Sequence, residues 1–138
     1  MRIIILIIYK LIFAHLPNSE RGNWISLTIR KLRGSVGKVL FDHCGSHVNI
    51  EKGADFGTGK GISIGSYSGI GVNCKVRGPL IIGEYVMMGP NVNILTHSHH
   101  FDRTDIPMCK QGGYFDGVTI GNDVWIGMNT IILPGVHI

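Results

Sequence analysis

The sequence predicts an all-β fold, a parallel β-helix built from six-residue repeats and preceded by an N-terminal helical segment. Three observations predict it. An apolar residue recurs every six positions through most of residues 64–138. Glycine supplies 20 of the 138 residues, about twice its usual ~7% share, as expected for a chain with many tight corners. The repeats are not separated by the helices of ~10–15 residues that a doubly wound α/β fold requires.

The repeat also predicts which side chains face the interior. The first and fifth positions of a six-residue unit lie on the same face of a short strand, and glycine after the first position allows a tight corner. Three units are expected to complete one coil of about 18 residues, so that Ile64 packs on Ile82. The other predicted stacks are Ile70 on Met88 and Val76 on Ile94. The ten first positions are Ile64, Ile70, Val76, Ile82, Met88, Ile94, Ile120, Ile126, Ile132 and Ile138.

Composition and cysteine usage exclude several classes of protein. A chain with 44% hydrophobic residues and a net charge of +4 is not disordered, and it contains no run of ~18 apolar residues that would span a membrane. The three cysteines, Cys44, Cys74 and Cys109, form no C-x-x-C motif, which argues against a disulfide framework or a cysteine zinc site and fits a reducing compartment. Cys74 falls on an inward fifth position, so we expect it to be a small core residue.

The charge divides the chain into a basic segment, residues 1–40, and a repeat domain, residues 41–138. The segment has seven basic residues and one acidic residue, a net charge of +6. The repeat domain has six basic and eight acidic residues, a net charge of −2. This asymmetry indicates that the basic segment faces an anionic surface or partner, and we expect no nucleic-acid partner.

Within the basic segment, an apolar run at Ile3–Ile8 is separated by a predicted chain break at 18–22 from a second apolar stretch. From Trp24 to Leu40, apolar residues recur at helical spacing with basic residues between them, which predicts an amphipathic helix. The helix either lies on anionic lipid or covers the open end of the repeat domain, and both arrangements can hold at once. Lys10 interrupts the first run and no cleavage motif follows, which argues against a secretory signal. We therefore expect a cytoplasmic protein, free or peripheral on the inner face of the membrane.

Residues 95–119 break the six-residue register and are expected to form an excursion loop, which in a regular framework usually has a function. The loop contains His97, His99 and His100. One histidine could be a general base, because its ordinary pKa of ~6.5 lies near neutral pH. Alternatively, His97 and His99 could bind a metal with Asp102, because H-x-H on a strand places both rings on one face. The third interpretation is a polar loop without chemistry. The loop contains no H-E-x-x-H motif.

Five motifs follow one another along the repeat domain and its loop. They are G-P-N-V at 89–92, T-H-S-H-H-F-D-R at 96–103, I-P-M at 106–108, Q-G at 111–112 and I-G-N-D-V-W-I-G at 120–127. In this order they resemble the left-handed β-helix (hexapeptide-repeat solenoid) O-acetyltransferases. The chain is similar to the galactoside, maltose and xenobiotic acetyltransferases and to the branch that modifies capsular and other cell-surface polysaccharides. The resemblance covers about residues 40–138.

The resemblance implies O-acetyl transfer from acetyl-CoA to a sugar hydroxyl, without a metal, in a homotrimer with active sites between subunits. The family's catalytic histidine lies nine residues beyond the proline of the G-P-N-V segment, which here is His99, with Asp102 at the matching acidic position and His97 as the second candidate. Neutral His99 would take the acceptor proton as the oxygen attacks the thioester, a backbone N–H would stabilise the oxyanion, and His99 would then protonate the CoA thiolate.

The resemblance also implies binding residues. Trp125 matches the family's tryptophan near the coenzyme arm, and Met128 stands where relatives place a small polar residue that contacts the coenzyme. Asn73 falls in the turn that lies near the acceptor in relatives.

Two other interpretations stay open. Relatives continue for further coils beyond Ile138, so we expect a C-terminally truncated chain that binds CoA poorly, and such a chain could be a non-catalytic β-helix subunit. A zinc-dependent carbonic anhydrase shares the architecture. Its three histidine ligands come from different coils across a subunit interface, however, whereas the histidines here lie in one loop.

Overall fold

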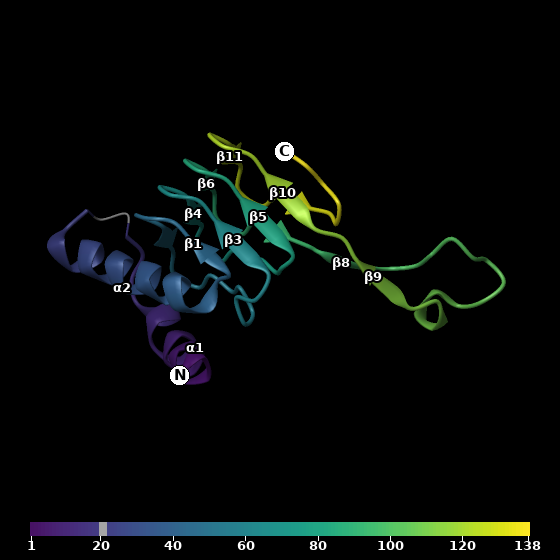
Figure 1. The fold of residues 1–138 in the computed structure, drawn as a ribbon, viewed down its shortest axis with the longest axis horizontal. Coiled ribbons are helices and arrows are strands. Elements are labelled where there is room, and N and C mark those ends of the chain that lie inside the picture. Colours follow the sequence, from purple (N-terminus) through teal and green to yellow (C-terminus); the bar gives the residue numbers. More distant parts are fainter. Residues whose placement is uncertain (20–21) are drawn as a thin grey trace.

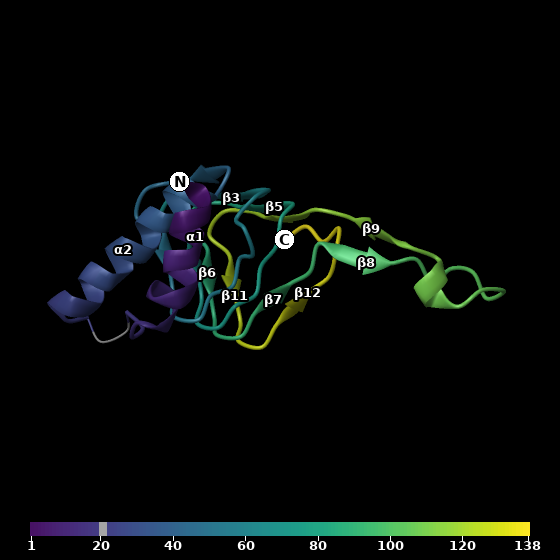
Figure 2. The same ribbon diagram turned by 90° about the horizontal axis from the view of Figure 1, so that it is seen from below.

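The computed structural model describes residues 1–19 and 22–138 and shows two helices followed by a body of short parallel strands (Figure 1 and Figure 2). Of the predicted chain break at 18–22, residues 20 and 21 lie outside the described residues. The helical elements that precede the strands are α1 (Arg2–Leu11), the 3-10 helix η1 (Phe13–His15) and α2 (Trp24–Leu40). The helix predicted from Trp24 to Leu40 is therefore present. The Asn23 side chain caps its first turn by accepting a hydrogen bond from the Ser26 backbone N–H at 2.9 Å.

The strands pair in parallel from one turn of the chain to the next, and we call each such turn a coil. One four-stranded sheet has the order β1 (His43–Cys44), β3 (Ile62–Ile64), β5 (Leu80–Ile82) and β10 (Val118–Ile120). Three parallel pairs complete the coils: β2 (Asn49–Ile50) with β4 (Gly69–Ile70), β6 (Met87–Met88) with β11 (Trp125–Ile126), and β7 (Asn93–Ile94) with β12 (Ile131–Ile132). These short parallel strands agree with the predicted fold class.

The spacing between paired residues shows how long each coil is. Ile62 pairs with Leu80, a separation of 18 residues, as predicted for three six-residue units. His43 pairs with Ser63, a separation of 20, so this first coil is two residues longer than three six-residue units. Leu80 pairs with Val118, a separation of 38, because the excursion lies between β5 and β10.

The core follows the predicted register. Ile64 pairs with Ile82 across β3 and β5, and the parallel bridge of Lys75 with Asn93 places Val76 beside Ile94, so both stacks are confirmed. Cys74 is fully buried, and burial raises the pKa of its thiol, in keeping with a core residue. Met88 is half-buried and Ile138 is exposed. The other eight first positions are buried: Ile64, Ile70, Val76, Ile82, Ile94, Ile120, Ile126 and Ile132.

Both helices cover the first coil. Gly34 lets α2 lie close to it, because a Cβ there would be only 2.6 Å from the carbonyl oxygen of Val48. From α1, the buried Tyr9 hydroxyl donates a 2.6 Å hydrogen bond to the Ala54 carbonyl oxygen. In the described part of the chain, every helix falls short of the length and apolar character needed to cross a membrane.

A buried polar network joins the chain after α1 to α2 and the first coil. The fully buried Arg33 donates to the Pro17 carbonyl oxygen at 2.8 Å, and its Nη1 lies 3.8 Å from Oε2 of Glu51. Glu51 accepts hydrogen bonds from the Ser19 N–H at 3.0 Å and the Asn49 amide at 2.7 Å. Burial raises the pKa of Glu51, but the hydrogen bonds from Ser19 and Asn49 and the nearby Arg33 outweigh it, so the pKa lies below its ordinary value.

The excursion forms a projecting ribbon that we call the arm, residues 97–117 (Figure 1 and Figure 2). Its antiparallel strands are β8 (His97–His99) and β9 (Gly113–Phe115), and the 3-10 helix η2 (Met108–Lys110) lies between them. The predicted loop of 95–119 is slightly longer than the arm. Val118 already belongs to β10, because its buried side chain occupies an inward position opposite Leu80.

Candidate functional site

The arm brings His97 and His99 together on one face of β8. Alternate side chains of a strand lie on the same face, and the two ring centroids are 5.4 Å apart in an edge-to-face arrangement. Phe115 on β9 packs against the His97 ring at 4.8 Å. The His100 ring instead lies 5.1 Å from Tyr114. Both His97 and His99 are exposed, so their side chains can be reached from solvent.

Gly113 permits this packing, although sequence reasoning gave it no role. It lies opposite His99 in the β8–β9 pair. A Cβ at this position would be 2.8 Å from Nε2 of His97 and 2.7 Å from the Ser98 carbonyl oxygen. Any side chain here would therefore displace the His97 ring or the ribbon backbone. The only sign in the sequence was the second glycine of the Gln111-Gly112-Gly113 run.

Asp102 lies on the exposed part of the arm beyond β8. In residues 1–19 and 22–138, no hydrogen bond or ion pair joins Asp102 to His97 or His99. The nearby loop is organised by other groups. Arg103 pairs with Asp105 and holds the pKa of that carboxyl below its usual value. The Gln111 amide donates to the Arg103 carbonyl oxygen at 2.7 Å, so Gln111 of the Q-G motif braces the loop.

A groove of ≈ 730 Å³ lies where the arm leaves the coils. His97 and Phe115 from the arm line one part of it, and Lys60 and Arg77 from neighbouring coils line another. Arg77 is paired with Asp55 at 2.7 Å, whereas no described carboxylate lies within ion-pair distance of Lys60. Because both His97 and cationic side chains line it, the groove can hold a polar molecule against the arm.

The remaining predicted site residues lie elsewhere on the surface and do not line this groove. Trp125 on β11 is 74% exposed and pairs with Met87 of β6. Met128 is 63% exposed in the turn that follows β11. Asn73 is an exposed corner residue with a φ of 54°. The structure thus places His97 beside His99. None of the described grooves is lined by the other predicted site residues, which are Asp102, Trp125, Met128 and Asn73.

A metal site on the arm gains no support from this geometry. Among the described residues, no group of three or more His, Cys, Asp or Glu side chains is arranged to hold a metal ion. His97 and His99 are neighbours, but a structural zinc site needs four ligands and a catalytic one needs three protein ligands.

Several known proteins that resemble this chain are named as acetyltransferases. Galactoside O-acetyltransferase of Lactococcus lactis subsp. lactis (strain IL1403) is 31% identical over 124 residues, which cover 86% of this chain and 58% of that protein. Nodulation protein L of Rhizobium meliloti (strain 1021) is 40% identical over 82 residues, which cover 56% of this chain and 43% of that protein. The crystal structure of a maltose O-acetyltransferase from Clostridium difficile 630 aligns with a TM-score of 0.64 and 28% identity, covering 78% of this chain and 57% of that one. The chain is therefore similar to acetyltransferases in both sequence and fold.

No family model matches this chain. It spans about half the length of the curated relatives it matches, from 43% to 58% of the first three. The exposed histidine pair makes the arm the part of this chain in which to look for chemistry.

Proposed function

We propose that this chain belongs to an O-acetyltransferase that transfers an acetyl group from acetyl-CoA to a sugar hydroxyl in the biosynthesis of a cell-surface or capsular polysaccharide. The observation that carries the proposal is the pair His97 and His99, exposed side by side on the arm of a chain related to galactoside and maltose O-acetyltransferases. The coils wind as a left-handed parallel β-helix. The active protein is a homotrimer with sites between subunits, and it is cytoplasmic or peripheral on the inner face of the membrane.

His99 is the proposed general base. A sugar hydroxyl is a weak nucleophile until it loses its proton, so neutral His99 accepts that proton while the oxygen bonds to the thioester carbonyl carbon. A backbone N–H stabilises the oxyanion. When the carbon–sulfur bond breaks, His99 returns the proton to the departing thiolate, which leaves CoA and the acetylated sugar. Asp102 or a backbone carbonyl holds the imidazole tautomer.

Three further residues are proposed to bind the substrates. Trp125 and Met128, exposed on the last described coils, offer apolar surface to the coenzyme. Asn73, exposed at a corner, offers an amide to the acceptor sugar. These roles follow the family resemblance, and the exposure of all three side chains is compatible with them.

The direct test incubates the chain with acetyl-CoA and a panel of mono- and disaccharides, with CoA release followed in solution and acetylated sugar identified by mass spectrometry. We expect CoA release that depends on the sugar and a product heavier by one acetyl group. Tight CoA binding without a product for any sugar would instead favour a non-catalytic subunit. Activity that requires added zinc and converts carbon dioxide would favour the carbonic-anhydrase interpretation.

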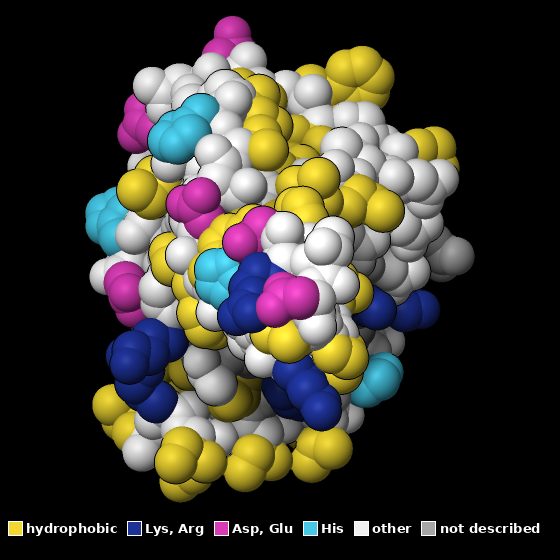
Figure 3. Space-filling model, turned by 90° about the vertical axis from the view of Figure 1, so that its right-hand side faces the viewer, with side chains coloured by type: hydrophobic (Ala, Val, Ile, Leu, Met, Phe, Trp, Pro, Cys, Tyr) yellow, Lys and Arg dark blue, Asp and Glu magenta, His cyan; other side chains and the backbone are white. Residues whose placement is uncertain are grey.

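The proposed membrane contact rests on the exposed face of α1. Ile3, Ile4, Ile7 and Leu11 are between 51% and 73% exposed. In Figure 3, hydrophobic side chains line the lower edge of the molecule, where α1 lies in Figure 1, and Lys and Arg side chains lie just above them. An apolar helical face with basic neighbours is the pattern that binds anionic lipid surfaces.

Sedimentation with vesicles tests this contact. We expect the chain to pellet with phosphatidylglycerol vesicles at low salt and to be released as salt rises, because each basic group near the surface contributes about 1 kcal/mol and is screened by salt. The double variant Ile4→Asp/Ile7→Asp should stay in the supernatant. Ile131→Asp, which changes an equally exposed isoleucine on β12, should behave like the unchanged chain. If the unchanged chain does not pellet at low salt, α1 serves only to cover the first coil.

A further inference from the structure

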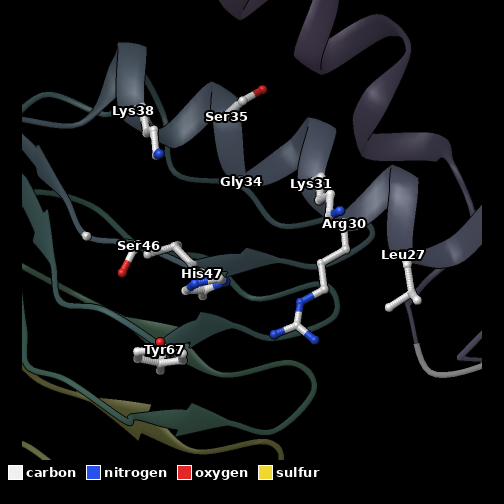
Figure 4. Close-up of a pocket in the computed structure, with 11 residues that line it drawn as sticks. Leu27, Arg30, Lys31, Gly34, Ser35, Lys38, Ser46, His47 and Tyr67 are labelled. Atoms are coloured by element: carbon white, nitrogen blue, oxygen red, sulfur yellow. The ribbon is translucent and has the colours of Figure 1, made fainter.

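A second groove, away from the arm, lies between α2 and the first coils. Its volume is ≈ 640 Å³, within the range of about 300–1,000 Å³ typical of small-molecule sites. Figure 4 shows its residues, with α2 along one side and the corners of two coils along the other. Gly34, which brings α2 close to Val48, forms part of its wall. The residues that line it come only from positions 27–67, so it contains no part of the arm.

The groove is cationic. Arg30, Lys31 and Lys38 of α2 line it, and no aspartate or glutamate does. None of the ion pairs formed by the described residues involves these three side chains. At 1.5 Å per residue, the eight positions from Arg30 to Lys38 spread the cations over about 12 Å of helix. A hollow lined by one sign of charge, without internal partners, attracts the opposite charge.

The opposite wall offers rings and hydroxyl groups. The His47 and Tyr67 rings stack with centroids 4.8 Å apart, and Tyr67 stacks on Tyr85 at 5.3 Å. His47 and Tyr67 are corner residues with φ values of 56° and 60°, in the left-handed region. Ser46 also lines the groove, whereas the Ser35 hydroxyl donates to the Leu32 carbonyl oxygen and points away from the rings (Figure 4). Stacked rings and the Ser46 hydroxyl therefore face the cations of α2 across the groove.

We propose that this groove binds a soluble phosphorylated sugar. Arg30 presents a planar guanidinium that can bind a phosphate through two hydrogen bonds, and Lys31 and Lys38 add charge. The sugar then lies against His47 and Tyr67, with its hydroxyl groups within reach of Ser46. A phosphate could also belong to a lipid headgroup. However, no residue of α1 lines the groove, and Figure 4 shows α1 beyond α2 from it, so the apolar face of α1 does not present this groove to a membrane.

Calorimetry with glucose 1-phosphate, inorganic phosphate and glucose tests the proposal on the whole chain. We expect glucose 1-phosphate to bind more tightly than inorganic phosphate, and glucose not to bind. The variant Lys31→Glu/Lys38→Glu should weaken glucose 1-phosphate binding at least about tenfold, or about 1.4 kcal/mol. The control Lys52→Glu/Lys75→Glu makes the same charge change at exposed positions outside the groove and should leave the affinity within about twofold, since exposed charges contribute little.

Two further measurements identify the ligand. Tyr67→Ser should weaken glucose 1-phosphate binding and leave inorganic phosphate binding unchanged, because only the sugar packs against the ring of Tyr67. Circular dichroism confirms that each variant is folded, and Lys31→Gln replaces the glutamate variant if it is not. The proposal is overturned if glucose 1-phosphate does not bind the unchanged chain, if both double variants lose it equally, or if Lys31→Glu/Lys38→Glu reduces binding only to phosphatidylglycerol vesicles. It does not depend on acetyl transfer, so it can fail or succeed separately from the proposed function.

Discussion

The coils and the arm are held together by different interactions. In β3 and β5, the inward residues Ile62, Ile64, Leu80 and Ile82 are at most 2% exposed, and each packs on a residue of the next coil. In the arm, no described side chain is buried, and the antiparallel hydrogen bonds of β8 and β9 hold the ribbon. The fold therefore depends on the coils, while the histidines lie where substitutions do not open a core. Changes in the arm should alter chemistry, and changes in the coils should alter stability.

The largest expected effect is on catalysis and comes from the arm. His99→Ala should lower kcat by about two to four orders of magnitude, because a general base contributes about that much, while CoA affinity and the unfolding midpoint stay unchanged. His97→Ala should lower kcat less. Steady-state kinetics on the acceptor found in the sugar panel measures both variants. Equal losses in the two variants that added zinc reverses would contradict the general-base role and support a metal site.

A core substitution should give the next largest effect, on stability. Ile82→Ala should lower the free energy of unfolding by about 2–5 kcal/mol, because it leaves a cavity between β3 and β5. Its neighbour Ile81 is 56% exposed on the same strand and provides the matched control. Ile81→Ala should change the free energy by less than about 0.5 kcal/mol. Urea unfolding followed by circular dichroism measures both, and similar losses would show that burial in the coils does not set stability.

Replacing Glu51 tests whether the buried polar network stabilises the fold as the apolar core does. Because the folded pKa of Glu51 is lowered, its contribution is present above the ordinary carboxyl pKa of ~4.3 and is lost as pH falls through the folded value. Glu51→Gln should therefore lower the free energy of unfolding by about 1–3 kcal/mol at pH 7. The difference from the unchanged chain should shrink below about pH 4. The exposed Glu84→Gln is the control, and a Glu51 effect independent of pH would exclude the charge as its cause.

Much of the coil structure was predictable because its physics is local and periodic. Six-residue spacing predicted the stack of Ile64 on Ile82 and the burial of Cys74, since one strand position repeats in each coil. Helical spacing predicted α2. The network of Arg33 with Glu51 was not predictable, because it joins residues brought together only by packing between separate elements.

The site was predictable only in part. The H-x-H spacing predicted that His97 and His99 share a face, as they do. The pairing of β8 with β9 was not foreseen, because neither strand has a buried face that would produce an alternating pattern. The role of Gly113 depends on its close approach to His97 across the ribbon. That contact could not be predicted from the sequence, because the pairing of β8 with β9 creates it.

The 38-residue spacing between β5 and β10 bears on how such proteins diversify. Leu80 pairs with Val118 in the same parallel manner in which Ile62 pairs with Leu80 across 18 residues, so the stack continues as if the arm were absent. Closing the longer loop costs only roughly 0.7 kcal/mol more than closing the shorter one, less than one buried methylene contributes. The length of the arm can therefore change without altering how the coils pair. Evolution or engineering can lengthen, trim or replace it between residues 96 and 118 while every coil keeps its neighbours.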